Sequence, residues 1–299
     1  MNQKILYIFI CVVILFVACN DDDKLTPTET PEFGYFVPQG EHDYDQAIVE
    51  WNKKCNTFIL YKYNLKELYW QVNAWQESQK QPENAAYPYS AGLVAEVADE
   101  EYVGLQLELI ENSFLSFYRD TMLKRCIPLK LLLCSKMDWR DARGAMKLYN
   151  VYSGYDYLAF NWGSAEIVSM TTDQKKVFKV EANKLFLERL LDKKKIVVPS
   201  DFYVGSNYTD RITTTNMYSR GFLSRATKQE DDVNYYIEAI ISTSYEDLNS
   251  EYNNVDSYKG VLNPIKDVNG LIRKKYDILV NYFKGEYGID LQKIGDSVI

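Results

Sequence analysis

Histidine is almost absent from this sequence of 299 residues, in which His42 is the only one. Serine and cysteine hydrolases generally need a histidine base beside the nucleophile, and the sequence has no Gly-x-Ser-x-Gly turn either. No Cys-x-x-Cys pair and no cluster of cysteine with histidine is present, which disfavours a thiolate zinc site. His42 lies near the start of the region expected to fold, and we predict that it is a surface residue.

A long run of basic residues is also missing. The chain carries 34 Lys and Arg against 42 Asp and Glu, which gives a formal net charge of -8. An acidic chain of this kind is a poor partner for the phosphates of nucleic acid or for anionic lipids. We therefore expect no nucleic-acid partner, and we expect any membrane attachment to depend on acyl chains.

No apolar run is long enough for a stable transmembrane helix. The run at residues 5–17 is short and has the form of a secretory signal peptide. Ala18-Cys19 follows it and resembles a lipobox, in which the cysteine is lipidated, although Phe16 stands where that motif usually has leucine. A plain signal peptide cleaved elsewhere is the alternative. We predict a lipoprotein signal over residues 1–18 and a disordered acidic tether over 19–32.

The five cysteines do not form an obvious disulfide framework. Cys11 lies in the predicted signal and Cys19 is the predicted lipidation site, so an odd number remains. Cys126 and Cys134 are eight residues apart, which in a strand would separate them by roughly 26 Å and prevent a bridge. Buried free thiols are the favoured interpretation, and a bridge from Cys55 to one of the two stays open.

Helical and strand patterns fill the remaining residues and predict one α+β domain over 33–299. A strong helix is predicted to begin near Thr172 or Asp173, and Asp99 is a candidate cap for an earlier one. The predicted helices are 43–55, 99–126, 172–195, 230–247 and 265–285. The predicted strands are 56–65, 129–134 and two within 146–163, joined by a turn near Ser153-Gly154.

The order of these features resembles the substrate import-associated zinc metallohydrolase lipoproteins, also called zinc-binding metallopeptidases. The resemblance covers most of residues 33–291, including "IPLKLLLC", the strand pair, the helix that follows and the Gly221-Phe222 segment. It implies a zincin-like metallopeptidase domain with a small mixed sheet, an active-site-type helix and C-terminal helices. It also implies a setting in the outer membrane beside a TonB-dependent nutrient importer and its surface lipoprotein.

The active-site helix of that family carries His-Glu-x-x-His, and Val180, Glu181 and Lys184 stand at the three functional positions here. The chemistry needs two imidazoles one helical turn apart, so that both lone pairs meet one metal. Valine has no lone pair, and lysine holds its proton at neutral pH. The resemblance thus implies a degenerate motif that has lost its zinc. Candidates for the family's acidic third ligand are Glu230, Asp231, Asp232 and Glu238.

An ordinary surface helix is the simpler interpretation of these residues taken alone. Glu181, Lys184 and Glu188 form a ladder of charges that solvated helices commonly carry, each pair contributing about 0.2 to 0.5 kcal/mol. The place of the helix, after the strand pair and before the Gly-Phe segment, favours a degenerate active-site helix. In that case we expect Val180 to fill the emptied metal pocket and Lys184 to bring its ammonium near Glu181.

The 25 Tyr and 5 Trp suit a binding function, although most of them are expected in the core and in strands. Together with the resemblance, the sequence predicts a lipid-anchored, non-catalytic outer-membrane protein that serves a nutrient importer as an accessory or by binding a peptide or glycan. Which face of the outer membrane it occupies, including exposure on the cell surface, stays open. An active zinc-dependent hydrolase with an unrecognised metal site is the alternative. A glycosidase using paired carboxylates and a purely structural lipoprotein are weaker interpretations.

Overall fold

The computed structural model describes residues 34–69 and 91–299 and divides the chain into Met1–Tyr35 and Phe36–Ile299. The predicted signal peptide, Cys19 and the tether at 19–32 lie outside the described residues. Within the second unit the helices are α2 Asp45–Cys55, α3 Lys66–Tyr69, α4 Val103–Ser113, α5 Asp120–Cys126, α6 Thr172–Asp192, α7 Gln229–Ser242, α8 Tyr245–Asn249, α9 Leu271–Tyr282 and α10 Leu291–Asp296. The strands are β1 Phe58–Leu60, β2 Gly92–Val97, β3 Lys130–Arg140, β4 Met146–Leu148, β5 Val151–Ser153 and β6 Tyr157–Phe160.

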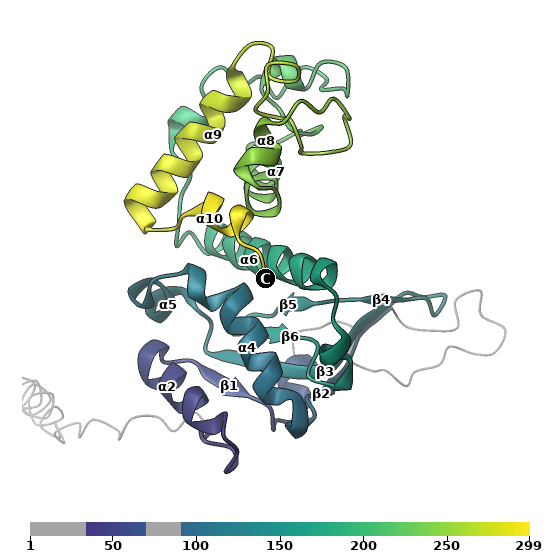
Figure 1. The fold of residues 1–299 in the computed structure, drawn as a ribbon, viewed down its shortest axis with the longest axis vertical. Coiled ribbons are helices and arrows are strands. Elements are labelled where there is room, and N and C mark those ends of the chain that lie inside the picture. Colours follow the sequence, from purple (N-terminus) through teal and green to yellow (C-terminus); the bar gives the residue numbers. More distant parts are fainter. Residues whose placement is uncertain (1–33, 70–90) are drawn as a thin grey trace, which may run out of the picture. The chain divides into compact units, whose positions relative to one another are not determined.

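The strands form one mixed sheet around β3, as Figure 1 shows. The first half of β3 pairs in parallel with β1 and β6, and β5 adds to β6 in the antiparallel direction. The second half of β3 pairs with β2 and β4, both antiparallel. The small mixed sheet that the sequence predicts is therefore present.

The first half of β3 is buried on both faces, which explains its unbroken apolar sequence. Leu131 and Leu133 share a core cluster with Phe160 of β6, with Phe186 of α6 and with Phe114 from the turn after α4. Leu132, on the opposite face, is also fully buried. Because side chains alternate between the two faces of a strand, this part of the sheet must be covered on both sides.

Helix α6 lies between the sheet and the group of α7 to α10, and it contacts β5 and α7 (Figure 1). It begins as predicted, with a capping box in which the Gln174 amide donates to the Thr171 hydroxyl at 3.2 Å. The Thr171 amide donates in return to the Gln174 side chain at 2.8 Å. Reciprocal bonds of this kind satisfy two of the free donors at a helix start and fix where α6 begins.

Several predicted elements are shorter or more broken than their patterns suggest. The helix predicted over 99–126 is divided into η1 Glu100–Tyr102, α4, η2 Leu115–Phe117 and α5, and the Asp99 side chain makes no capping hydrogen bond. The helix predicted over 230–247 is broken between α7 and α8, where the Ser244 hydroxyl begins a new cap. Helix α9 begins only at Leu271, after turns, and strand β1 has three residues. Sequence propensity predicts that these segments are helical, whereas local capping and packing decide where each helix begins and ends.

The three cysteines of the described residues, Cys55, Cys126 and Cys134, remain free thiols. Cys55 and Cys134 are buried, whereas Cys126 is half-buried at the end of α5 and not in a strand. The open bridge from Cys55 is therefore not formed in this structure. Within residues 34–69 and 91–299, no helix has both the length and the apolarity needed to cross a bilayer.

Candidate binding site

The three motif positions, Val180, Glu181 and Lys184, lie in the middle of α6, and Lys184 contacts the next long helix. The Lys184 ammonium forms an ion pair with the Glu238 carboxylate of α7, and each side chain is about one-third exposed. Val180 is half-buried and packs against the core cluster. The expected partner of the Lys184 ammonium is Glu181, but its ion-pair partner in the structure is Glu238 of the neighbouring helix.

Glu181 is exposed at the surface of α6, and a neutral donor holds its carboxylate in place. The Asn150 amide donates to Glu181 at 2.9 Å, and the Asn150 oxygen accepts from the Trp162 indole at 2.7 Å. Asn150 and Trp162 are both buried, so each side chain has its conformation fixed by its surroundings. The strand pair therefore orients the glutamate of α6.

The Trp162 backbone is strained, with a φ of 80° in the left-handed region. This conformation is rare for a bulky residue and persists only where the surrounding structure imposes it. Asn161 imposes it here, because its side-chain oxygen accepts from the Trp162 amide at 2.8 Å and its side-chain amide donates to Tyr149 and Met137 carbonyls. Strain at the end of β6 is thus part of the structure that orients Glu181.

Two further titratable groups lie beside the Lys184–Glu238 pair. Burial raises the pKa of Glu188, and the nearby Glu238 and Asp192 carboxylates add to the shift while Lys184 opposes it. Burial, together with Glu238, also raises the pKa of the Tyr258 phenol well above its usual value. The Tyr258 phenol therefore stays protonated at neutral pH, in the loop after α8 and close to Glu238 of α7.

The other candidates for an acidic third ligand are placed elsewhere. Asp232 is fully buried and forms an ion pair with Lys275 of α9, whose ammonium also lies over the rings of Phe202, Phe222 and Tyr236. Glu230 is exposed and Asp231 is half-exposed in the first turn of α7. Of the four candidates, Glu238 is the one that the described structure brings into direct contact with Lys184 of α6.

The residues at the motif do not fit a zinc ion. Val180 offers no donor atom, the Lys184 ammonium is paired, and only the carboxylates of Glu181 and Glu238 remain, without nitrogen or sulfur ligands. In the part of the chain that the structure describes, no group of three or more His, Cys, Asp or Glu side chains is arranged to hold a metal. His42 is separate from the motif, stacked on Tyr44 and within 3.3 Å of Glu100, with its side chain 39% exposed.

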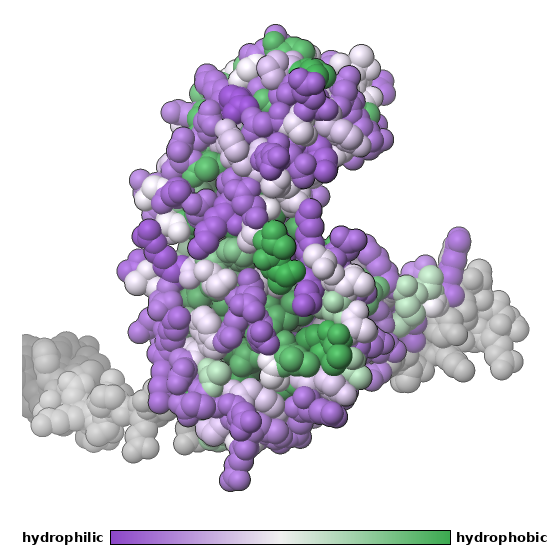
Figure 2. Space-filling view, in the orientation of Figure 1, coloured by the Kyte–Doolittle hydropathy of each residue, from purple (hydrophilic) through white to green (hydrophobic). Residues whose placement is uncertain are grey.

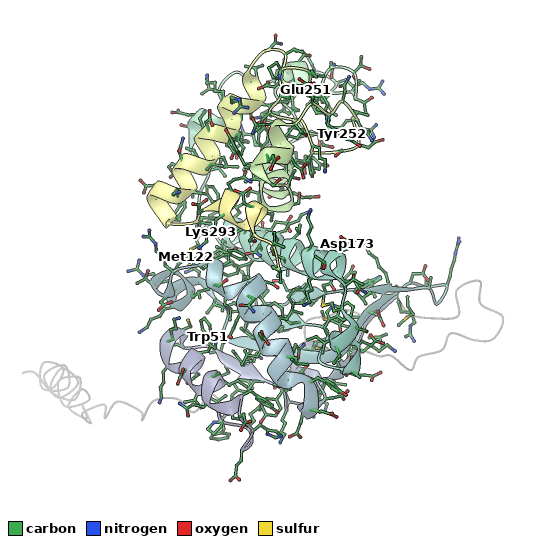
Figure 3. The ribbon with its side chains drawn as sticks, in the orientation of Figure 1. Trp51, Met122, Asp173, Glu251, Tyr252 and Lys293 are labelled. Atoms are coloured by element: carbon green, nitrogen blue, oxygen red, sulfur yellow. The ribbon has the colours of Figure 1, made fainter. Side chains whose placement is uncertain are left out.

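A pocket of about 240 Å³ lies next to the same network. It is lined by Thr214, Met217, Leu223, Ser224, Arg225, Val255, Asp256, Ser257 and Tyr258. Figure 2 shows the surface hollowed between the part that carries α8 and the part that carries the sheet. Figure 3 labels Tyr252, in the loop after α8, and Asp173, in the first turn of α6, on the two sides of this hollow.

Sequence reasoning missed most of this arrangement. The other residues of this arrangement come from elements and loops outside α6, and no spacing in the sequence connects them with Glu181 or Lys184. They are Asn150, Trp162, Tyr258 and Arg225. One signal is present in the sequence: Asn161-Trp162 at the end of a predicted strand. There, two side chains that can form hydrogen bonds follow a buried apolar run. Its partners become visible only in the folded chain.

No protein-family model matches the chain, and no curated protein matches it. Among solved structures it matches the crystal structure of a "putative zinc-binding metallo-peptidase" from Bacteroides caccae ATCC 43185. The two sequences are 12% identical, and the match covers 86% of this chain and 91% of that chain with a TM-score of 0.48. A likeness of this size does not assign chemistry to any residue of this chain.

Proposed function

We propose that this chain is a non-catalytic relative of zinc metallohydrolases that captures a ligand and does not cleave it. The observation that carries the proposal is the ion pair between Lys184 and Glu238. The resemblance puts Lys184 at a histidine position and makes Glu238 one of four candidates for the acidic ligand, and the lysine ammonium supplies positive charge beside this carboxylate. With Val180 at the remaining ligand position, the site has no means to bind zinc and activate water.

The proposal includes a lipid anchor and a place in nutrient import. It is supported by the signal-like run at residues 5–17, by Ala18-Cys19 and by the acidic tether at 19–32. An acylated Cys19 would hold the folded unit at the outer membrane, facing the cell exterior, and the tether would let it reach a TonB-dependent importer and its surface lipoprotein. The binding surface would be the pocket lined by Tyr258, with a peptide or glycan as the ligand.

Zinc binding by the rebuilt motif tests the proposal directly. The full chain, purified in detergent, is exposed to zinc, freed of unbound metal and analysed for zinc per chain. We expect the wild-type chain to retain almost none. The double variant Val180→His with Lys184→His is expected to retain about one zinc per chain, because two imidazoles at i and i+4 would share the ion with Glu238.

A matched control separates this site from any pair of histidines on a helix. Asp173→His with Val177→His places the same i, i+4 pair on exposed positions of α6, without Glu238, and is expected to release its zinc during removal of free metal. Equal zinc retention by both double variants would show that α6 and α7 do not place Glu238 where it could share a metal with the two histidines. A wild-type chain that holds about one zinc and hydrolyses peptides until a chelator is added would establish the alternative, an active hydrolase with unrecognised ligands.

A further inference from the structure

The pocket beside Tyr258 has a wall that a buried cation holds in position. The Lys266 side chain is 1% exposed, and its ammonium donates to the carbonyls of Asn254, Ser257 and Lys259 at 2.7, 2.7 and 2.6 Å. These carbonyls belong to the same loop that lines the pocket with Val255, Asp256, Ser257 and Tyr258. Three short bonds to one ammonium fix the loop, so the wall is formed before any ligand arrives.

The opposite wall is anchored in a small core of its own. Met217 lies in the pocket wall and also packs in a buried cluster with Ile212, Phe222 and Ala226. Leu223, Ser224 and Arg225 line the pocket next to this cluster. The Tyr218 hydroxyl connects the two walls by donating to the Val255 carbonyl at 3.1 Å. Both walls are therefore fixed by groups that lie outside the pocket.

Two charged groups line this pocket and are left unpaired by the described part of the chain. Across residues 34–69 and 91–299, neither the Arg225 guanidinium nor the Asp256 carboxylate makes a hydrogen bond or an ion pair, and both residues are exposed. A guanidinium presents paired N–H donors that match a carboxylate. Met217, Leu223 and Val255 supply apolar surface beside these charges.

We propose that this pocket binds the C-terminal end of a peptide whose last side chain is apolar. Arg225 binds the terminal carboxylate, the apolar lining receives the side chain, and Asp256 accepts a backbone N–H of the peptide. The volume of 240 Å³ is below the usual range of about 300 to 1,000 Å³ for ligand pockets, so it suits a chain end and not a longer segment. This inference rests on the proposed function, since it names what the pocket captures.

Calorimetric titration of the full chain in detergent tests the assignment with three probes: N-acetyl-Leu-Leu, its C-terminal amide and glucuronic acid. We expect the free-acid peptide to bind most tightly. Replacing its carboxylate by an amide is expected to weaken binding at least about tenfold, because a charge-assisted bidentate contact is lost. Arg225→Gln should weaken binding of the free-acid peptide by a similar factor and leave the affinity for the amide almost unchanged.

Arg143→Gln is the matched control, because Arg143 is exposed in the turn between β3 and β4 and does not line the pocket. Thermal unfolding of both variants checks that the fold is kept. Equal binding of acid and amide, an unchanged affinity in Arg225→Gln, or no binding by any probe at about 10 mM would overturn the inference. Binding of glucuronic acid as tightly as the peptide, lost in Arg225→Gln, would overturn the peptide assignment in favour of an acidic sugar. Zinc retained by the wild type would instead contradict the proposed function, so the two failures are distinct.

Discussion

Buried lysines are the most unusual residues of this protein. Four of them, Lys130, Lys179, Lys266 and Lys275, are at most 5% exposed among the described residues. An ammonium buried without partners would be too costly to keep, and each of the four donates to carboxylate or carbonyl oxygens. Lys184, half-buried against Glu238, uses the same principle at the candidate site. The fold therefore supplies internal positive charge through its own side chains.

Glu188 gives a prediction at this scale. Its folded-state pKa is raised, so the folded protein binds more protons than the unfolded chain between the two pKa values, and stability falls as the pH rises through that window. Glu188→Gln removes the free-energy cost of ionising a half-buried carboxyl group. We expect urea unfolding to show a larger gain in stability over the wild type at pH 7 than at pH 4.5. Glu251→Gln, at an exposed position, is the control, and an equal gain at both pH values would contradict the assignment.

At the scale of elements, α6 connects the two parts of the folded unit. One side contacts β5 of the sheet and the other contacts α7, and its buried positions include polar side chains that reach neighbouring segments. Asn183 donates to the Ser113 carbonyl at 2.8 Å and accepts from the Tyr118 hydroxyl at 2.9 Å. Lys179 donates to the carbonyls of Ile294 and Ser297 at the end of α10. The helix thus positions Val180, Glu181 and Lys184 by contacts on both sides.

Lys179 carries the prediction for this element. Lys179→Met keeps the length of the side chain but leaves two carbonyls at the end of α10 without their donor. We expect a loss of about 1 to 3 kcal/mol in the free energy of unfolding and faster hydrogen exchange in residues 291–297. Lys176→Met, one turn earlier at an exposed position of α6, should change neither quantity. Unchanged exchange in the Lys179 variant would show that the lysine does not hold α10.

At the scale of the whole molecule, the proposal depends on how the folded unit is attached to a membrane. A single acyl chain gives only marginal membrane binding, so stable attachment requires the several chains of a processed lipoprotein. The net charge of -8 adds no electrostatic attraction to anionic lipid. All of the attachment should therefore depend on Cys19.

Cys19→Ser tests this attachment. We expect the wild-type chain to fractionate with outer membranes and to be removed from intact cells by an added protease. The variant should leave the membrane fraction almost completely, because no other anchoring feature remains in the proposal. Cys126→Ser, which alters a half-buried thiol at the end of α5, is the control and should fractionate as the wild type does. Membrane fractionation that survives in Cys19→Ser would contradict lipidation at this residue.

Local sequence determined where many of the elements lie. The unbroken apolar run in β3, the capping signal at Thr171 and the turn between β5 and β6 act over a few residues, so their periodicity and turn chemistry could be interpreted directly. The near absence of histidine is by itself enough to deny the motif in α6 the usual zinc-peptidase chemistry. These are properties of short stretches or of composition.

Only the tertiary structure decided what each site residue contacts. The choice of Glu238 as the partner of Lys184, the orientation of Glu181 by Asn150 and the bond from Trp162 to Asn150 all depend on segments 12 to 54 residues apart in the chain. Helix ends such as the break before α8 were set by caps and packing. Long-range contacts of this kind follow from how the helices and the sheet fill space together, and no local pattern in the sequence records them.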